Sequence, residues 1–288
     1  MKSLLLNGVN HLKITSNLPF VAADGQVYYA YDLEEWPFQG KTIYEVIRIM
    51  AGKPLFMEEH LERLRQSGLT LGMPMEGIEA AVAEDMKQVV AHCEIEDNNL
   101  KIVAGYLETG AFSYVVFPVK SFYPPKDYYE NGIKTVLMHV ERENPNAKVI
   151  NAELSTKVDN MRETSDIFEG LLVDSEGRIT EGSRSNVFFV QGDRLLTPRS
   201  NHVLLGITRQ KLLAAIEVLG IAFEEAEIKA SEVHLYDACF ITGTSIGLLP
   251  VAQIDDQKID SPGNPILKKL QEGYDRIVQT SLEKIDWE

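Results

Sequence analysis

A segment without periodicity, Ser121–Asn131, divides the chain into two parts that both mix strand patterns and helix patterns. It carries two prolines and three tyrosines, which favours a connecting segment over a helix or a strand. We therefore predict a small N-terminal domain over residues 1–120, a linker over 121–131 and a larger C-terminal domain over 132–288. A surface loop inside one domain is the alternative. Because both parts mix strands and helices, the predicted fold class is α/β (α+β).

Hydrophobic periodicity places the elements within these two parts. Runs rich in β-branched and aromatic residues predict strands, and apolar residues at helical spacing predict helices. Acidic Glu58 and Glu59 stand at the start of the first helical pattern, where a helix carries partial positive charge. The predicted strands are 26–31, 42–48, 100–104, 112–117, 135–140, 171–173, 187–190 and 240–242, and the predicted helices are 61–71, 78–90, 154–168, 207–219 and 266–282.

Composition and charge exclude several kinds of function. The 288 residues carry a formal net charge of −15 at pH 7, which disfavours wide contact with nucleic acid or a membrane surface. A local pocket on such a protein can still be positive. Two distant cysteines, Cys93 and Cys239, form neither a metal-ligand pattern nor a disulfide framework. We find no signal-peptide pattern and no run of about 18 apolar residues, so we expect a cytoplasmic protein without a metal.

Lys148 precedes Glu181 by 33 positions (181 − 148), and these two residue types together suit one kind of cofactor chemistry. A lysine amine can form a Schiff base with an aldehyde cofactor. A carboxylate against a pyridine nitrogen keeps that ring protonated, which makes the ring an electron sink. Lys157 competes with Lys148, because both stand in a Lys-Val-x-Asn pattern. Lys157 falls in a polar helical stretch where we expect a solvated side chain, but local sequence does not choose between the two.

Three further segments could hold a phosphate. Gly206-Ile207-Thr208-Arg209 opens a predicted helix, and helix starts present unpaired N–H groups and partial positive charge. Thr242-Gly243-Thr244-Ser245 follows a predicted strand and offers hydroxyl and backbone N–H groups. Taken alone, each of these segments is better explained as a plain helix cap or a plain turn than as a phosphate site. Arg63 lies near the apolar face of a predicted helix and needs a defined partner, which is either a phosphate or one of Glu59 and Glu62.

Together these segments resemble the class IV, fold type IV pyridoxal-phosphate enzymes, which include branched-chain aminotransferases, D-amino-acid aminotransferases and aminodeoxychorismate lyase. The resemblance extends from about Thr42 to Val251, and it rests on seven motifs in the family's order. The motifs are Tyr44-Glu45, Glu59-His60-Leu61-Glu62-Arg63-Leu64, Lys148-x-x-Asn151, Thr180-Glu181-Gly182 with Ser185-Asn186-Val187-Phe188, Leu196-Thr197-Pro198, Leu205-Gly206-Ile207-Thr208-Arg209, and Gly243-Thr244 with Pro250-Val251.

The resemblance implies a role for each matched residue in a two-domain enzyme with pyridoxal 5'-phosphate as cofactor. The family's lysine-to-glutamate distance is a little over thirty residues, which fits Lys148 and not Lys157, at 24 residues (181 − 157). Lys148 would form the Schiff base and carry the proton, and Glu181 would pair with the pyridine nitrogen. The other matched positions would hold the phosphate (Arg63, Ile207, Thr208 and Thr244) and meet the substrate (Tyr44 and Ser245).

Two departures from the family pattern concern the substrate. Residues 32–41 lack the Asp-Arg-Gly and Gly-Asp-Gly of many members, and Val103-Ala104-Gly105-Tyr106-Leu107 lacks an arginine that fixes the substrate carboxylate in several members. Carboxylate binding would then fall to neutral donors, which hold a carboxylate less strongly than an arginine does. Apolar Val103, Ala104 and Leu107 predict a small or medium apolar amino acid as the donor.

Several functions compete for this pattern. The first is an aminotransferase, a homodimer by the family resemblance, that moves an amino group between an aliphatic, branched-chain-like amino acid and a 2-oxo acid. The runners-up are an aminodeoxychorismate-type lyase, which would use the same Lys148 and Glu181 to release pyruvate, and a D-amino-acid aminotransferase. From another class comes a catalytically idle homologue that acts as a binding module. The intact Lys148, Glu181 and Arg63 argue against an idle homologue.

Overall fold

The computed structural model describes residues 12–287 apart from Glu34, Ser121 and residues 143–144. Contacts divide the chain into two compact units, and each mixes helices with strands, which confirms the predicted α/β class. No helix in the described part of the chain is long and apolar enough to cross a membrane. Unit one comprises Met1–Ser121, Ala147–Ile150 and Leu282–Glu288, and unit two comprises Phe122–Asn146 and Asn151–Ser281.

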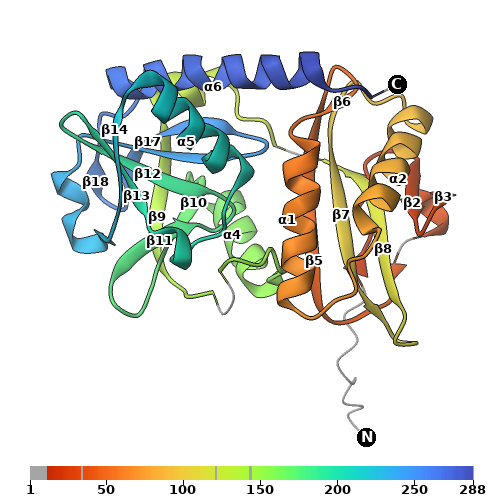
Figure 1. Cartoon of the computed structure of the whole chain (residues 1–288). Helices are drawn as coiled ribbons and strands as arrows, with labels where there is room; N and C mark the ends of the chain where they lie inside the picture. The colour runs from red at the N-terminus through yellow and green to blue at the C-terminus, as the bar shows by residue number, and fades with distance from the viewer. Residues whose placement is uncertain (1–11, 34, 121, 143–144, 288) are drawn as a thin grey trace, which may run out of the picture. The chain divides into compact units, whose positions relative to one another are not determined.

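Unit one is built on a six-stranded antiparallel sheet in the order β3-β2-β8-β7-β5-β6 (Figure 1). Two helices cover one face of this sheet, and their apolar sides pack on Ile43, Ile47 and Ile49 of β5. The elements are β2 (Phe20–Ala23), β3 (Gln26–Tyr29), β5 (Phe38–Met50), β6 (Lys53–Pro54), α1 (Met57–Thr70), α2 (Ile78–His92), β7 (Asp97–Leu107) and β8 (Phe112–Val119), with β1 (Leu12–Lys13) and β4 (Glu35–Trp36) paired separately.

Unit two is built on a ten-stranded mixed sheet in the order β14-β13-β12-β16-β17-β9-β10-β11-β15, with β18 paired to β17. Its core is a cluster of buried residues that includes Leu171, Val187 and Ile241. The strands are β9 (Ile133–His139), β10 (Glu169–Val173), β11 (Arg178–Gly182), β12 (Asn186–Gln191), β13 (Arg194–Pro198), β14 (Ala222–Ala226), β15 (Ile228–Lys229), β16 (Ala238–Gly243), β17 (Gly247–Ile254) and β18 (Gln257–Lys258). The helices of the chain after residue 121 are α3 (Lys126–Asn131), α4 (Ala152–Thr164), α5 (Ile207–Leu219) and α6 (Pro265–Lys284).

The structure corrects some of the predicted elements. The first predicted strand ends at Tyr29, because Ala30–Asp32 forms a 3-10 turn. Within the segment predicted as a linker, Lys126–Asn131 forms the short helix α3, with Pro125 at its N-cap. The predicted helix 154–168 ends at Thr164, and Phe168 instead packs in the core of unit two.

Candidate functional site

Lys148 lies in a short segment that pairs with β5 inside unit one. The Tyr44 amide donates to the Lys148 carbonyl at 2.9 Å, and the Ile150 amide donates to the Thr42 carbonyl at 3.1 Å. On the other side, the Lys148 amide donates to the Oγ of Ser67 on α1 at 3.1 Å, and Ser67 is fully buried. The backbone of Lys148 is therefore held by both a strand and a helix, so its side chain leaves from a fixed point.

The ring of Tyr44 is shared by two lysine ammonium groups. Lys148 Nζ lies 4.8 Å from the ring centroid and Lys101 Nζ lies 5.4 Å from it, which is within the range of cation–π attraction. On β7, Lys101 stands opposite Val46 and Val103 stands opposite Tyr44, so these four side chains share one face of the sheet. Because Lys148 approaches from one edge of β5 and Lys101 from β7 at the other edge, β5 lies between them.

The sheet register also determines on which face of the sheet each of the apolar residues expected near the substrate lies. Val103 shares the face of Tyr44, and Leu107 belongs to the same cluster of side chains. Ala104 stands opposite Ile43 and packs toward the helices, so it lies on the other face of the sheet from Tyr44. Successive strand residues point to opposite faces, which separates Val103 from Ala104.

Arg63 makes a two-pronged ion pair with Glu45, a fully buried residue of β5. Its Nε and Nη2 atoms lie 2.7 Å from Oε1 and Oε2 of the carboxylate, and His60 Nδ1 lies 2.8 Å from Oε2. Glu45 is therefore a partner of Arg63 in the protein, because the face of α1 that carries His60 and Arg63 is turned to β5.

Charge in this cluster is set by burial and pairing. Burial alone would raise the pKa of the Glu45 carboxyl, but Arg63 and His60 hold that pKa far below its usual value. Burial lowers the pKa of His60 against the opposing effect of Glu45. At neutral pH the cluster therefore contains an ionised Glu45 and an uncharged His60 that donates from Nδ1. A guanidinium has five N–H donors, so pairing through two nitrogens does not prevent Arg63 from also meeting a phosphate.

Glu181 lies on β11 in unit two, and its side chain is 3% exposed. The Leu204 amide donates to Oε2 at 3.0 Å, while Arg142 Nε lies 2.8 Å from Oε1. Arg142 also donates from Nη2 to the Ser183 carbonyl at 2.6 Å. An adjacent cation and a backbone donor both favour the ionised form of a buried carboxylate. The sequence did not single out Arg142, which has no motif of its own.

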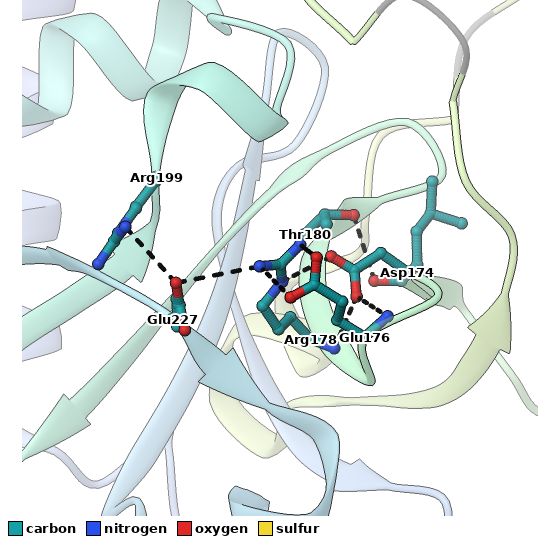
Figure 2. A network of polar contacts seen from close by, with 7 residues as sticks. Asp174, Glu176, Arg178, Thr180, Arg199 and Glu227 are labelled. Atoms are coloured by element: carbon teal, nitrogen blue, oxygen red, sulfur yellow. Dashed lines mark hydrogen bonds and ion pairs between the residues drawn. The ribbon is translucent and has the colours of Figure 1, made fainter.

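The β10–β11 hairpin that carries Glu181 is fixed at its turn by a network of charges (Figure 2). Asp174 accepts from the Arg178 amide at 2.9 Å and pairs with Arg178 Nε at 2.8 Å. Glu227 links Arg178, at 3.9 Å, to Arg199, at 3.5 Å. Burial would raise the pKa of Asp174, but the bonds from Arg178 and Glu176 lower it below its usual value. This network holds the strand that leads through Thr180 to Glu181.

The predicted phosphate segment at α5 begins where the sequence indicated. Gly206 is the N-cap and the helix starts at Ile207, with Ile207 and Thr208 both buried. Asn186 donates from Nδ2 to the Leu204 carbonyl at 2.8 Å, and a Cβ on Gly206 would lie 2.1 Å from Asn186 Oδ1. A side chain at this cap would therefore push Asn186 away from Leu204, and the Asn186 bond ties the loop from Leu204 to β12.

Thr242 adds an observation that bears directly on a ligand. It stands opposite Asn186 in the β12–β16 pair and is 1% exposed, yet its Oγ1 has no hydrogen-bond partner among the described residues. A buried hydroxyl without a partner is costly, so this position suits a polar ligand. Thr244 and Ser245 follow in the half-buried turn between β16 and β17.

The structure thus places the predicted residues in two groups. Tyr44, Arg63 and Lys148 belong to unit one, while Glu181 and the phosphate and substrate candidates Ile207, Thr208, Thr244 and Ser245 belong to unit two. The buried Glu181 carboxylate, the unpartnered Thr242 hydroxyl and the start of α5 all belong to unit two. Together they fit a cofactor with a ring nitrogen and a phosphate. The sequence analysis gave no role to Glu45, although it lies in the Tyr44-Glu45 motif, and it did not single out Lys101 or Arg142. The signal for Lys101 was its period-2 spacing from Val103.

Comparisons with known proteins show the family of the chain. The sequence matches the family model for amino-transferase class IV over residues 42–254. The D-alanine aminotransferase of Bacillus licheniformis is 28% identical over 271 residues, 88% of this chain and 94% of that protein. A probable branched-chain-amino-acid aminotransferase of Aquifex aeolicus is 28% identical over 267 residues, 85% of this chain and 86% of that protein.

One solved structure shows the same fold with a cofactor derivative bound. It is a T.th. branched-chain amino acid aminotransferase complexed with N-(5'-phosphopyridoxyl)-L-glutamate. It superposes with a TM-score of 0.80 at 20% sequence identity and covers 93% of this chain and 96% of that chain. At this identity the likeness shows the fold.

Proposed function

Since this chain belongs to the class IV aminotransferases, a family of pyridoxal-phosphate enzymes, we propose that it transfers an amino group from an aliphatic amino acid to a 2-oxo acid. The observation that carries the proposal is Lys148, whose backbone is held by Tyr44 and Ser67 and whose ammonium lies 4.8 Å from the Tyr44 ring. A reactive amine must be held in place before it can act in catalysis. Lys148 meets this requirement, whereas Lys157 is exposed on α4.

Each predicted residue receives a role in this proposal. When bound, pyridoxal 5'-phosphate supplies an aldehyde and an electron-withdrawing ring. Lys148 would hold the cofactor through its amine. Once the substrate amine has displaced it, Lys148 Nζ would be the base for the Cα proton, because a general base must lie within hydrogen-bond reach of that proton. Glu181 would accept the N–H of the ring nitrogen. The phosphate would be held by Arg63, Thr244 and the first residues of α5, Ile207 and Thr208.

The substrate proposal rests on the face of the sheet around Tyr44. Val103 and Leu107 would lie against an aliphatic side chain. Lys101, beside the Tyr44 ring, would meet the α-carboxylate together with the Tyr44 hydroxyl and the backbone N–H groups near Ser245. A lysine is a flexible point charge without the fork of an arginine, so we expect moderate affinity for the carboxylate.

A panel of amino donors tests this substrate class. Leucine, isoleucine, valine or alanine should have a kcat/KM about tenfold or more above that of aspartate or glutamate, because burying an unpartnered second carboxylate costs more than ~1.4 kcal/mol. Both enantiomers belong in the panel, read by loss of the absorbance of the lysine-bound cofactor. Preference for an acidic donor would refute the aliphatic assignment. Pyruvate released from aminodeoxychorismate would make the protein a lyase instead.

Replacing Arg63 tests the phosphate contact. Arg63→Ala should weaken pyridoxal 5'-phosphate about 10–100-fold more than unphosphorylated pyridoxal, since a hydrogen bond to a charged group contributes about 1.5–3 kcal/mol. Arg65→Ala is the matched control, because Arg65 is on the same helix and pairs with Glu62 at 2.7 Å on the surface.

Alanine at position 63 would leave Glu45 buried beside His60 without its cation. The Arg63→Met, Glu45→Gln double variant has no unpaired buried carboxylate. It should show the same larger loss of affinity for pyridoxal 5'-phosphate than for unphosphorylated pyridoxal. Equal weakening of the phosphorylated and unphosphorylated forms would mean that Arg63 is a structural partner of Glu45 and nothing more.

We also propose that the protein is a cytoplasmic homodimer. Cys93 and Cys239 form no disulfide, which supports a reducing compartment, and the net charge of −15 disfavours nucleic-acid and membrane partners. The homodimer follows from the family resemblance. Sedimentation at micromolar concentration would test it, and a monomeric species with full activity would contradict it.

A further inference from the structure

Arg142 occupies a place beside Glu181 that none of the proposed roles uses. Its Nε lies 2.8 Å from Glu181 Oε1, and its Nη2 donates to the carbonyl of Ser183, two residues further along the chain, at 2.6 Å. One planar guanidinium therefore contacts both the carboxylate and the backbone that follows it. The Arg142 side chain is 17% exposed, so this pair lies in a site largely removed from water.

The backbone contact of Arg142 is itself anchored from the other side. The Ser183 hydroxyl donates to Oε1 of Glu169, and the Ser185 hydroxyl donates to Oε2 of Glu169 at 3.1 Å. The Glu169 side chain is 1% exposed, and its Oε1 also accepts from the Gly170 amide at 2.9 Å. The turn after Glu181 is thus fixed by Glu169, which gives Arg142 a rigid carbonyl to hold.

The other ionisable groups around Glu181 are two carboxylates and one histidine. Glu141, Asp174 and His202 line a small cavity of about 40 Å³ together with Arg142 and Glu181. Asp174 is neutralised by Arg178, as described above. Among the described residues that line this cavity, Arg142 is the one lysine or arginine. A nearby cation favours the charged form of a buried carboxylate, and Arg142 places such a cation 2.8 Å from Glu181, whose side chain is 3% exposed.

We propose that Arg142 is a positioning residue for Glu181: it keeps the carboxylate ionised and, with the Leu204 amide on Oε2, turned to receive the N–H of a pyridine ring. This inference rests on the proposed function, because it concerns the cofactor nitrogen that Glu181 would face. Arg142 itself need not touch the cofactor. A lysine could supply the charge, but it lacks the planar group that lies beside Oε1 and donates to the Ser183 carbonyl at once.

Two cofactor analogues separate this role from a structural one. Pyridoxine 5'-phosphate lacks the aldehyde and binds reversibly, and its 1-deaza analogue has a carbon in place of the ring nitrogen. The protein should bind the nitrogen-containing analogue about 10–100-fold more tightly, as a charge-assisted hydrogen bond predicts. In Arg142→Met this preference should fall below about threefold while the deaza analogue binds as before, and Arg142→Lys should restore part of it.

Matched variants keep the test decisive. Arg194→Met removes an exposed arginine that lies 3.6 Å from Glu224, and it should leave the preference unchanged. Glu181→Gln should abolish the preference, and the Arg142→Met, Glu181→Gln protein, which has no stranded buried charge, should match Glu181→Gln alone. Equal weakening of both analogues in Arg142→Met would overturn the positioning role. If the unsubstituted protein binds neither analogue, the proposed function fails before the role of Arg142 is reached.

Discussion

Replacing Lys148 by alanine is expected to lower the rate of amino transfer by about 10²–10⁴-fold or more, which is the usual contribution of a positioned proton carrier. The loss should be larger than for any other single residue, because Lys148 would serve both as the covalent anchor and as the base at the substrate Cα. Single-turnover kinetics with a reactive amino donor would measure it. Protein with the cofactor bound, reduced by borohydride and mapped by peptide, should carry the label on Lys148.

Lys157→Ala is the matched control for Lys148→Ala. The two lysines share the Lys-Val-x-Asn pattern, but Lys157 is exposed on α4, whereas the Lys148 backbone is bonded to Tyr44 and Ser67. We expect Lys157→Ala to retain full activity. A label on Lys157, or a Lys148→Ala protein that keeps its transfer rate, would show that the spacing to Glu181 had been misinterpreted.

Glu181→Gln is expected to slow removal of the Cα proton by about 10²–10³-fold, the range seen when one electrostatic stabiliser of a transition state is removed. A neutral amide cannot keep the ring nitrogen protonated, so the ring withdraws electron density from the substrate Cα less strongly. Phosphate contacts should survive, because Arg63 and the start of α5 are unchanged. Stopped-flow absorbance with a Cα-deuterated donor would isolate the proton-removal step.

Glu176→Gln serves as the control for Glu181→Gln. Glu176 lies in the turn of the same hairpin, and its side chain is 68% exposed, so it should have no effect on the proton-removal step. An unchanged half-reaction rate in Glu181→Gln would exclude the electron-sink role for this carboxylate. A loss of cofactor affinity without a slower proton-removal step would mean that Glu181 holds the ring in place but does not affect its electron withdrawal.

Strong periodicity and flanking glycines made several elements predictable. Helix α5 was expected over 207–219 and spans Ile207–Leu219, because Gly206 caps one end and Gly220 takes a left-handed φ of 63° at the other. Strand β5 was found where β-branched residues cluster, although pairing with β7 extends it to Phe38–Met50. Strand β11 had no such signal, since a five-residue strand with one large apolar residue, Ile179, is specified by its neighbours in the sheet.

Sequence alone specified the residue types of the candidate site and their order along the chain: a lysine, a glutamate at family spacing, and a helix start. Each motif consists of residues close together in the sequence, so it can be recognised without a structure. The partners of these residues came from the tertiary structure. Glu45 meets Arg63 across 18 positions and Ser67 meets Lys148 across 81, and no local pattern encodes such pairs. The register of the strands and the orientation of α1 bring these pairs together, and the pairing is needed because an unpaired buried charge is costly.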